Sequence, residues 1–144
     1  MNQKGGDDGP SLFALLHAAG AAQAHVETRL AAIDLSLAKL AALTALADAG
    51  ESLPLGQLAG RLSCVKSNIT QLIDRLETDG LVARQASPTD RRTRLAVMTP
   101  AGRKAWRDGT RIQQQAERDL FKGLSRDEAG HLRELIAKIR PATA

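Results

Sequence analysis

The clearest pattern of hydrophobic and polar positions lies in the middle of the chain, between residues 55 and 80. Apolar residues recur there at spacings of three and four positions, which places them on one face of a helix. The residues of this stripe are Val65, Ile69, Leu72, Ile73 and Leu76. A shorter amphipathic segment, 55–62, precedes it, and Gly80 stands where a helix C-cap favours a left-handed residue. The pattern predicts two helices joined by a tight turn, the second over 65–79.

Directly after this segment the periodicity changes from that of a helix to that of a strand. Apolar and polar residues alternate over 81–87 and over 93–99, and the intervening Pro-Thr-Asp of 88–90 is typical of a turn. The apolar positions of the alternation are Leu81, Val82, Leu95 and Val97. A helix-turn-helix followed by a hairpin is a winged helix-turn-helix, and a short strand at 52–53 is expected to complete its sheet.

The segments before the helix-turn-helix are also helical in pattern. An Ala-rich and Leu-rich stripe repeats over 12–33, after a helix start at Pro10-Ser11. Ser36 is placed to cap a second helix, which Gly50 ends. The positions of that helix expected to face inward are Leu37, Leu40, Leu43, Thr44 and Ala47.

Two further helices follow the hairpin. Thr99 and Pro100 combine a capping hydroxyl with a proline at the first helical position, and the helix is expected to run towards Leu120 with a weak point at Gly109. Ser125 begins the last helix with a capping box. Its apolar stripe, which Pro141 ends, is Leu132, Leu135, Ile136 and Ile139.

This element order predicts a mainly α fold with a small β hairpin (α+β). In the 144 residues, 43% are apolar but only 2% aromatic, which favours Leu-rich and Ala-rich helices. The expected divisions are a flexible tail (1–10), an N-terminal dimerisation helix (11–34), a winged helix-turn-helix DNA-binding domain (35–99) and C-terminal helices that complete the dimer interface (100–144). A compact winged helix does not need the terminal stripes for itself, so we expect a second copy to cover them.

The charge of the chain is concentrated in the same region. The formal net charge is +4. Between Arg61 and Lys104 there are nine basic and four acidic residues, a net +5, which leaves the rest of the chain at −1. A basic region in an otherwise nearly neutral chain is typical of a protein that binds a polyanion.

The outer face of the 65–79 helix carries short or flexible hydrogen-bonding side chains. We expect this face to enter the DNA major groove, which is about 12 Å wide and presents a distinct donor and acceptor pattern for each base pair. The candidate DNA-binding residues here are Lys66, Ser67, Asn68, Thr70, Gln71 and Arg75. For this face alone, the alternative is an ordinary solvated helix surface.

The tip of the hairpin adds two cations. Arg91 and Arg92 are expected to enter the minor groove or to bind phosphates, because a guanidinium group suits both. Asp90 is expected to hold one of these arginines in a fixed rotamer rather than to contact DNA itself. The alternative is a charged tip that keeps a sheet edge soluble. The preceding helix-turn-helix favours DNA binding.

The single cysteine, Cys64, falls in the turn between the two helices. Near a helix N-terminus and Lys66, its thiol would be a candidate oxidant sensor, whereas a small buried residue in a tight turn would be inert. One cysteine forms neither an intrachain disulfide nor a cysteine-based zinc site. We expect no metal and no other cofactor.

Several classes of protein are excluded by what the sequence lacks. No histidine adjoins a Ser or Cys nucleophile motif, and no Gly-rich phosphate loop or paired-carboxylate pattern occurs, so we expect no enzymatic activity. No apolar run approaches about 18 residues, and the start lacks the layout of a signal peptide. A cytoplasmic protein without a membrane partner is expected.

From Leu37 onwards, and most strongly over 55–103, the chain resembles the MarR (multiple antibiotic resistance regulator) family. The matching pieces are LAGRLSCVKSNITQLIDRLETDGLV and the more specific wing motif DRRTRLAVMTPAGR. The resemblance implies a dimeric bacterial DNA-binding protein, usually a repressor, that responds to small phenolic or otherwise anionic ligands or to oxidants. Gln71 stands where many members carry Arg, which moves the expected base preference from guanine towards adenine. Cys64 stands where Gly is common.

The expected function is sequence-specific regulation of transcription by a homodimer on double-stranded DNA. Two-fold symmetry would place two recognition helices about 34–36 Å apart on a pseudo-palindromic operator. A small-molecule inducer in a cavity between the terminal helices and the DNA-binding domains would change that separation. The alternatives are a winged helix used for protein–protein contact and an oxidant sensor that acts through Cys64. Binding to random duplex DNA that weakens steeply with salt would distinguish a DNA-binding protein from a protein-contact module.

Overall fold

The computed structural model describes residues 11–62 and 68–140, and the predicted tail (1–10) and Pro141 lie outside these ranges. The elements are α1 (Leu12–Ala31), α2 (Leu37–Asp48), β1 (Ser52–Pro54), α3 (Leu55–Arg61), α4 (Ile69–Thr78), β2 (Val82–Ala86), β3 (Arg94–Met98), α5 (Pro100–Phe121) and α6 (Arg126–Lys138). The fold is mainly helical with one small antiparallel sheet, as predicted. None of the helices in the described ranges is both long and apolar enough to cross a membrane.

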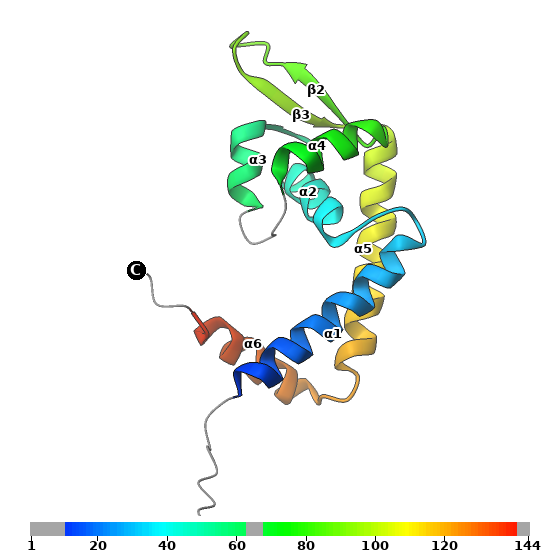
Figure 1. Ribbon diagram of the computed structural model, residues 1–144, viewed down its shortest axis with the longest axis vertical. Coiled ribbons are helices and arrows are strands. Elements are labelled where there is room, and N and C mark those ends of the chain that lie inside the picture. Colours follow the sequence, from blue (N-terminus) through cyan, green and yellow to red (C-terminus); the bar gives the residue numbers. More distant parts are fainter. Residues whose placement is uncertain (1–10, 63–67, 141–144) are drawn as a thin grey trace, which may run out of the picture.

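The elements form a head and a helical base (Figure 1). We call α2, α3, α4 and β1 the head, and we call the β2–β3 hairpin with its tip the wing. The base consists of α1, α6 and the end of α5. The long helix α5 begins beside the head and extends to the base, where α1 packs against it. Helix α6 lies at the same end of the molecule as α1 (Figure 1).

Four helices begin where the sequence predicts. Ser11, Ser36, Thr99 and Ser125 each accept a hydrogen bond from the backbone N–H three residues further on. The carboxylate of Glu128 completes the capping box by accepting from the backbone N–H of Ser125 at 3.0 Å. These bonds satisfy donors that the first turn of a helix otherwise leaves unpaired.

The sheet has the strand order β1-β3-β2, with both pairs antiparallel. The short strand predicted at 52–53 is therefore present and completes the sheet. The buried positions of β3 are Ala96 and Met98, whereas Leu95 and Val97 are only half-buried. A sequence shows that a strand alternates, but the packing of α2 and α5 against β3 decides which set of side chains faces the core.

The hydrophobic core is centred on α2, which contacts α3, α4, α5 and the sheet. Leu40 and Leu43 are buried, as predicted. The other three positions that were expected to face inward are only half-buried; they are Leu37, Thr44 and Ala47. Leu46 and Ala42, which lie off the predicted stripe, are completely buried. A helix with neighbours on several sides buries more than a single stripe, so the amphipathic pattern is a poor guide here.

Gly109 is not the weak point in α5 that the sequence predicts. A Cβ atom at this position would lie 2.8 Å from Cδ1 of Leu35 and 2.9 Å from Cδ1 of Leu40. The absent side chain lets α5 approach the start of α2 closely. In the first turn of α5, a Cβ on Gly102 would overlap the carbonyl oxygen of Leu81. The two glycines therefore allow α5 to pack closely against the rest of the fold.

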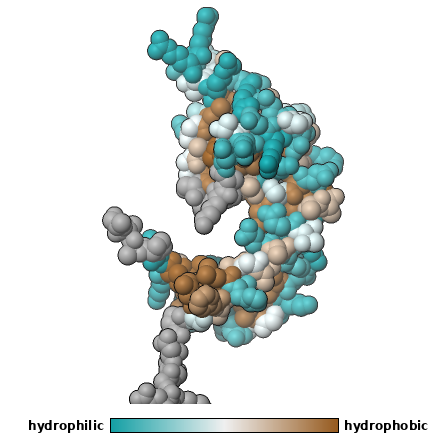
Figure 2. All heavy atoms as spheres, in the orientation of Figure 1, coloured by the Kyte–Doolittle hydropathy of each residue, from teal (hydrophilic) through white to brown (hydrophobic). Residues whose placement is uncertain are grey.

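The base leaves large apolar side chains uncovered. Phe13 is 81% exposed, and α6 has no buried residue. Figure 2 shows a hydrophobic surface at this end and a hydrophilic one around the wing. The other exposed apolar side chains of the base are Leu12, Leu15, Leu16, Phe121, Leu124, Leu135, Ile136 and Ile139. The head thus forms its core without these parts of the terminal stripes.

Candidate nucleic-acid interface

The recognition helix, α4, begins later than predicted. Its N-cap is Asn68, whose Oδ1 accepts from the backbone N–H groups of Thr70 at 3.1 Å and Gln71 at 3.4 Å. Asn68 is therefore a cap residue rather than part of the outer face, in keeping with the strong preference of asparagine for this position. Four residues predicted to lie in this turn and helix are outside the described residues; they are Cys64, Val65, Lys66 and Ser67.

The two faces of α4 are separated as predicted. Its buried side chains are Leu72, Ile73 and Leu76, with Ile69 half-buried. Thr70, Gln71 and Arg75 are exposed. Gln71 and Arg75 lie one turn apart and border a small pocket of about 90 Å³ that Lys39 of α2 also lines. At the other end of the helix Gly80 has φ +75°, the left-handed conformation that the prediction requires.

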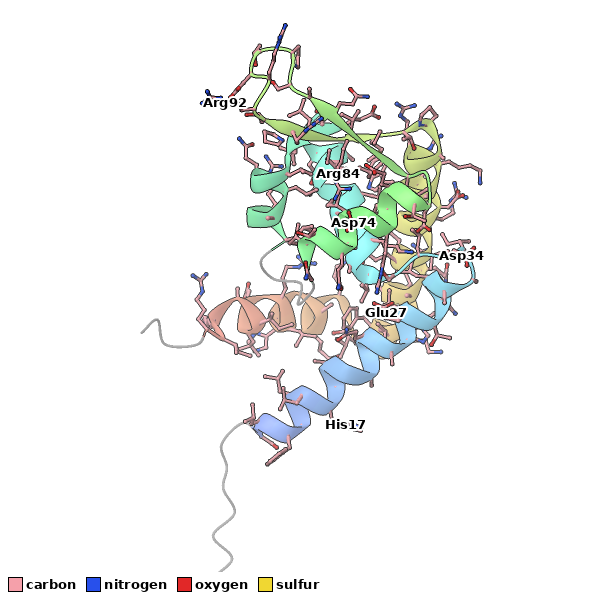
Figure 3. All side chains as sticks on the ribbon, turned by 45° about the horizontal axis from the view of Figure 1, so that its top comes forward. His17, Glu27, Asp34, Asp74, Arg84 and Arg92 are labelled. Carbon is pink, nitrogen blue, oxygen red and sulfur yellow. The ribbon has the colours of Figure 1, made fainter. Side chains whose placement is uncertain are left out.

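Arg84 of β2 binds two carboxylates of the recognition helix. Its Nη2 lies 2.6 Å from Oδ1 of Asp74, and its Nη1 lies 3.5 Å from Oε1 of Glu77. The backbone N–H of Arg84 also donates to Oε2 of Glu77 at 3.2 Å. The hydrogen bond to Asp74 is the main cause that raises the pKa of Arg84 above its ordinary value. Figure 3 shows Asp74 and Arg84 close together.

Asp90 fixes the tip of the wing, but not in the way predicted. Its Oδ1 accepts from the backbone N–H of Arg92 at 2.9 Å, and its Oδ2 accepts from the hydroxyl of Thr93 at 3.0 Å. No ion pair joins Asp90 to an arginine in the part of the chain that the structure describes. An aspartate readily bonds the backbone two residues on, so Asp90 shapes the turn instead of an arginine rotamer. Figure 3 shows Arg92 at the end of the wing, away from the head.

The basic residues of the region fall into two groups. Arg84, Arg103 and Lys104 are paired, the last two with Glu51 at 2.6 Å and Asp108 at 3.0 Å. The other described basic residues of the region form no ion pair with any described residue; they are Arg61, Arg75, Arg91, Arg92 and Arg94. All of these lie on the head or the wing, and all except Arg61 come after the segment that joins α3 to α4. Within 61–104, the described cations available to a polyanion therefore lie on these two parts.

The ion pairs that join the helices to one another and to the wing were not predicted from the sequence. Lys39 of α2 donates to Asp79, the C-cap residue of α4, at 2.8 Å. It lies 40 positions from its partner, Arg103 lies 52 from Glu51, and Arg84 lies 10 from Asp74. Local periodicity carries no signal for such pairs. The only hint is that Asp74 and Glu77, three apart on one helix, present two carboxylates to the same side.

A pocket of about 400 Å³ lies between α2, α3 and α5. Its position is between the head and the helix that leads to the base. It is lined by Leu37, Leu40, Ala41, Thr44, Ala45, Asp48, Arg61, Leu62 and Gln113. A mainly apolar wall with a few charged or polar groups is typical of a site for a small organic molecule.

Helices α3 and α4, joined to a wing whose tip arginines form no ion pair with the described residues, define a winged-helix DNA-binding protein. Comparison with known proteins agrees. The family model described as the MarR family matches residues 35–93. The transcriptional activatory protein BadR of Rhodopseudomonas palustris is 47% identical over 51 residues, which are 35% of this chain and 29% of BadR. The chain spans less than two thirds of the length of the curated relatives it matches.

Two solved structures are similar over nearly the whole chain. One is a probable transcriptional regulator from Pseudomonas aeruginosa, with 30% identity, a TM-score of 0.77, and coverage of 88% of this chain and 93% of that one. The other is BpsR from Bordetella bronchiseptica, with 26% identity, a TM-score of 0.80, and coverage of 94% and 100%. The chain belongs to the MarR family of transcriptional regulators and contains its DNA-binding winged helix. Its relatives are regulators, not enzymes.

Proposed function

We propose that this chain is a dimeric transcriptional repressor that binds a pseudo-palindromic operator and is released by a small ligand. The observation that carries the proposal is the pairing state of the cations on the head and wing. Arg75, Arg91 and Arg92 are exposed and form no ion pair with the described residues, while Arg84 and Arg103 bind carboxylates. The alternative of a protein-contact module gains no support from a tip with two unpaired arginines.

In this proposal α4 lies in the major groove. The amide of Gln71 suits the N6 and N7 atoms of adenine, and Arg75, one turn further on, suits guanine or a phosphate. Thr70 adds a hydroxyl at the same end of the helix. Asn68 still has a side-chain NH₂ to donate, because only its oxygen is used at the cap. Lys66 and Ser67 stay predictions for this end of the helix.

The wing lies in the adjacent minor groove in this proposal. Arg91 and Arg92 are at its tip, where guanidinium groups favour a narrow and electronegative groove. Asp90 supports them indirectly, because its two bonds fix the turn that carries both arginines.

The base is the proposed dimer interface, formed by the predicted segments 11–34 and 100–144. Covering each large apolar side chain that is now exposed would stabilise the dimer by up to about 1.5–3 kcal/mol before the costs of association, and by less where the side chain is already half-buried. A two-fold dimer would present two copies of α4 about one helical turn of DNA apart.

The pocket between α2, α3 and α5 is the proposed ligand site. The structure of BpsR is described as showing how 6-hydroxynicotinic acid regulates the DNA binding of that protein. Here Arg61 would attract an anionic group of the ligand. A ligand that moves the head relative to α5 would change the spacing of the two heads, and operator binding requires both half-sites together.

The salt dependence of binding to a random-sequence duplex tests the proposed DNA contact. A dimer that neutralises about 6–10 phosphates should lose about 10³–10⁵-fold in affinity between 50 and 200 mM salt. Arg92→Ala should weaken binding to every sequence and reduce the slope, whereas Gln71→Ala should mainly relax the base preference at one position of a selected site. A wild-type affinity that barely changes with salt would favour the protein-contact module instead.

A further inference from the structure

Arg84 is the outermost side-chain link between the wing and the recognition helix. Beyond it, the described residues from Gln85 to Thr93 make side-chain hydrogen bonds only among themselves. Among the side-chain hydrogen bonds of the described residues, those of Arg84 are therefore the last that join the wing to α4. Val82, at the start of β2, is buried in the core together with Leu76 of α4. The polar part of the link consists of contacts from Arg84 to Asp74 and Glu77, through both the guanidinium group and the backbone N–H.

The negative charges of the same two carboxylates oppose DNA binding. The side chains of Asp74 and Glu77 are 55% and 44% exposed and lie on the helix proposed to enter the major groove. Two negative charges there would repel the phosphates on either side of the groove. The Arg84 side chain is only 28% exposed and lies against both of them. It also lines a pocket of about 240 Å³ with Thr70 and Ile73, between α3, α4 and β2 rather than at the tip of the wing.

We infer that Arg84 is a positioning residue for DNA binding and not a phosphate contact. It holds the wing at a fixed angle to α4, so that Arg92 reaches the minor groove while Gln71 is in the major groove, and it neutralises the carboxylates of Asp74 and Glu77. This inference rests on the proposed function, and it assigns to Arg84 a role different from that of the other arginines of the basic region.

The test is a comparison of what Arg92→Ala costs in two backgrounds. The probe is a duplex enriched from a random pool by the wild-type protein, and binding is followed by fluorescence anisotropy. One background is wild type, and the other is Asp74→Asn/Arg84→Gln, which removes the pair without changing the net charge. We expect Arg92→Ala to cost about tenfold or more in wild type but less than about threefold in the double variant. The matched control, Gln71→Ala, should cost the same in both backgrounds.

A second comparison tests the neutralisation of charge. Arg84→Gln alone leaves both carboxylates uncompensated and should bind more weakly than Asp74→Asn/Arg84→Gln. Melting temperatures of all variants show whether each is folded. If the double variant does not fold, Arg84→Lys takes its place, because lysine keeps the charge but cannot span both carboxylates.

The outcomes distinguish a failure of this inference from a failure of the proposed function on which it rests. An equal cost of Arg92→Ala in both backgrounds would overturn the positioning role of Arg84 and leave the minor-groove contact intact. Arg84→Gln binding as well as the double variant would overturn the neutralising role. No cost of Arg92→Ala in wild type would overturn the proposed minor-groove contact, and the inference with it.

Discussion

Arg84 and Arg92 belong to the same hairpin, yet their surroundings give them different tasks. The guanidinium group of Arg84 has two carboxylates within reach, whereas that of Arg92 has none among the described residues. A count of basic residues treats the two as equal. At the scale of single residues, the partners of a cation decide whether its charge is available to DNA.

Gly102 is a residue whose lack of a side chain is required by the fold. We expect Gly102→Ala to lower the free energy of unfolding by about 1–3 kcal/mol, because the new Cβ would overlap the backbone carbonyl of Leu81 and α5 would have to shift. Urea denaturation measures this change. The control is Gly56→Ala in α3, where nothing lies within 4 Å, and which should be neutral or stabilising by up to about 1 kcal/mol. Similar stability of both variants would contradict the close packing of α5.

The ion pair between Glu51 and Arg103 predicts a dependence of stability on acid. The hydrogen bond from Arg103 lowers the pKa of Glu51 below its ordinary value of 4.5. A carboxyl with a lowered pKa stabilises the fold above its unfolded-state pKa, and this contribution is lost as the pH falls through the folded-state pKa. The melting temperature of wild type should therefore exceed that of Glu51→Gln at neutral pH, and the difference should shrink below about pH 4.5. A difference that stays constant down to pH 3 would argue against the pair.

At the scale of elements, the start of α4 is the feature that matters most for the proposed groove contact. Asn68 sets which residue begins the helix, and so determines where Thr70 and Gln71 lie on its first turn.

Replacing this cap should therefore affect both stability and DNA binding. We expect Asn68→Ala to cost about 0.5–2 kcal/mol in the free energy of unfolding, because two backbone N–H groups lose their partner. Asn68→Ser retains a capping oxygen and should recover most of the loss. Chemical denaturation followed by circular dichroism measures both. If alanine and serine are equally tolerated, the helix does not depend on this cap.

Local signals in the sequence were enough to predict most elements. Caps, turns and apolar stripes act within a few residues, so the hairpin, the short strand at 52–53 and four helix starts could be predicted and are present. What depends on packing between distant segments could not be. The buried face of β3, the full burial of Leu46 and the close packing at Gly109 are set by neighbours far away in the chain. The Arg84 and Lys39 ion pairs belong to the same category.

At the scale of the whole molecule, α5 connects two surfaces of opposite character. Its start packs beside the head and its end lies at the apolar base (Figures 1 and 2). A movement of the base relative to the head must therefore pass through α5 or through the short α1–α2 connection. The proposed ligand pocket, lined by residues of α2, α3 and α5, is placed where it could act on that movement.

The base should be the surface on which two copies meet. Ile136→Lys places a charge among exposed apolar side chains of α6 and should shift the protein from dimer to monomer in analytical ultracentrifugation, because an unpaired charge is costly to bury. Operator affinity should fall with it. Glu134→Lys, on the opposite side of the same helix by its spacing, is the control and should remain a dimer. A monomeric wild-type protein, or a dimeric Ile136→Lys, would contradict the proposed interface.

The most direct measurement is the sequence of the duplexes that the purified protein enriches from a random pool, together with the number of chains bound to each. The proposed geometry predicts two inverted half-sites with centres about 10 base pairs apart and two chains on each duplex. Enrichment of a single asymmetric half-site by one chain, or no enrichment at all, would contradict it.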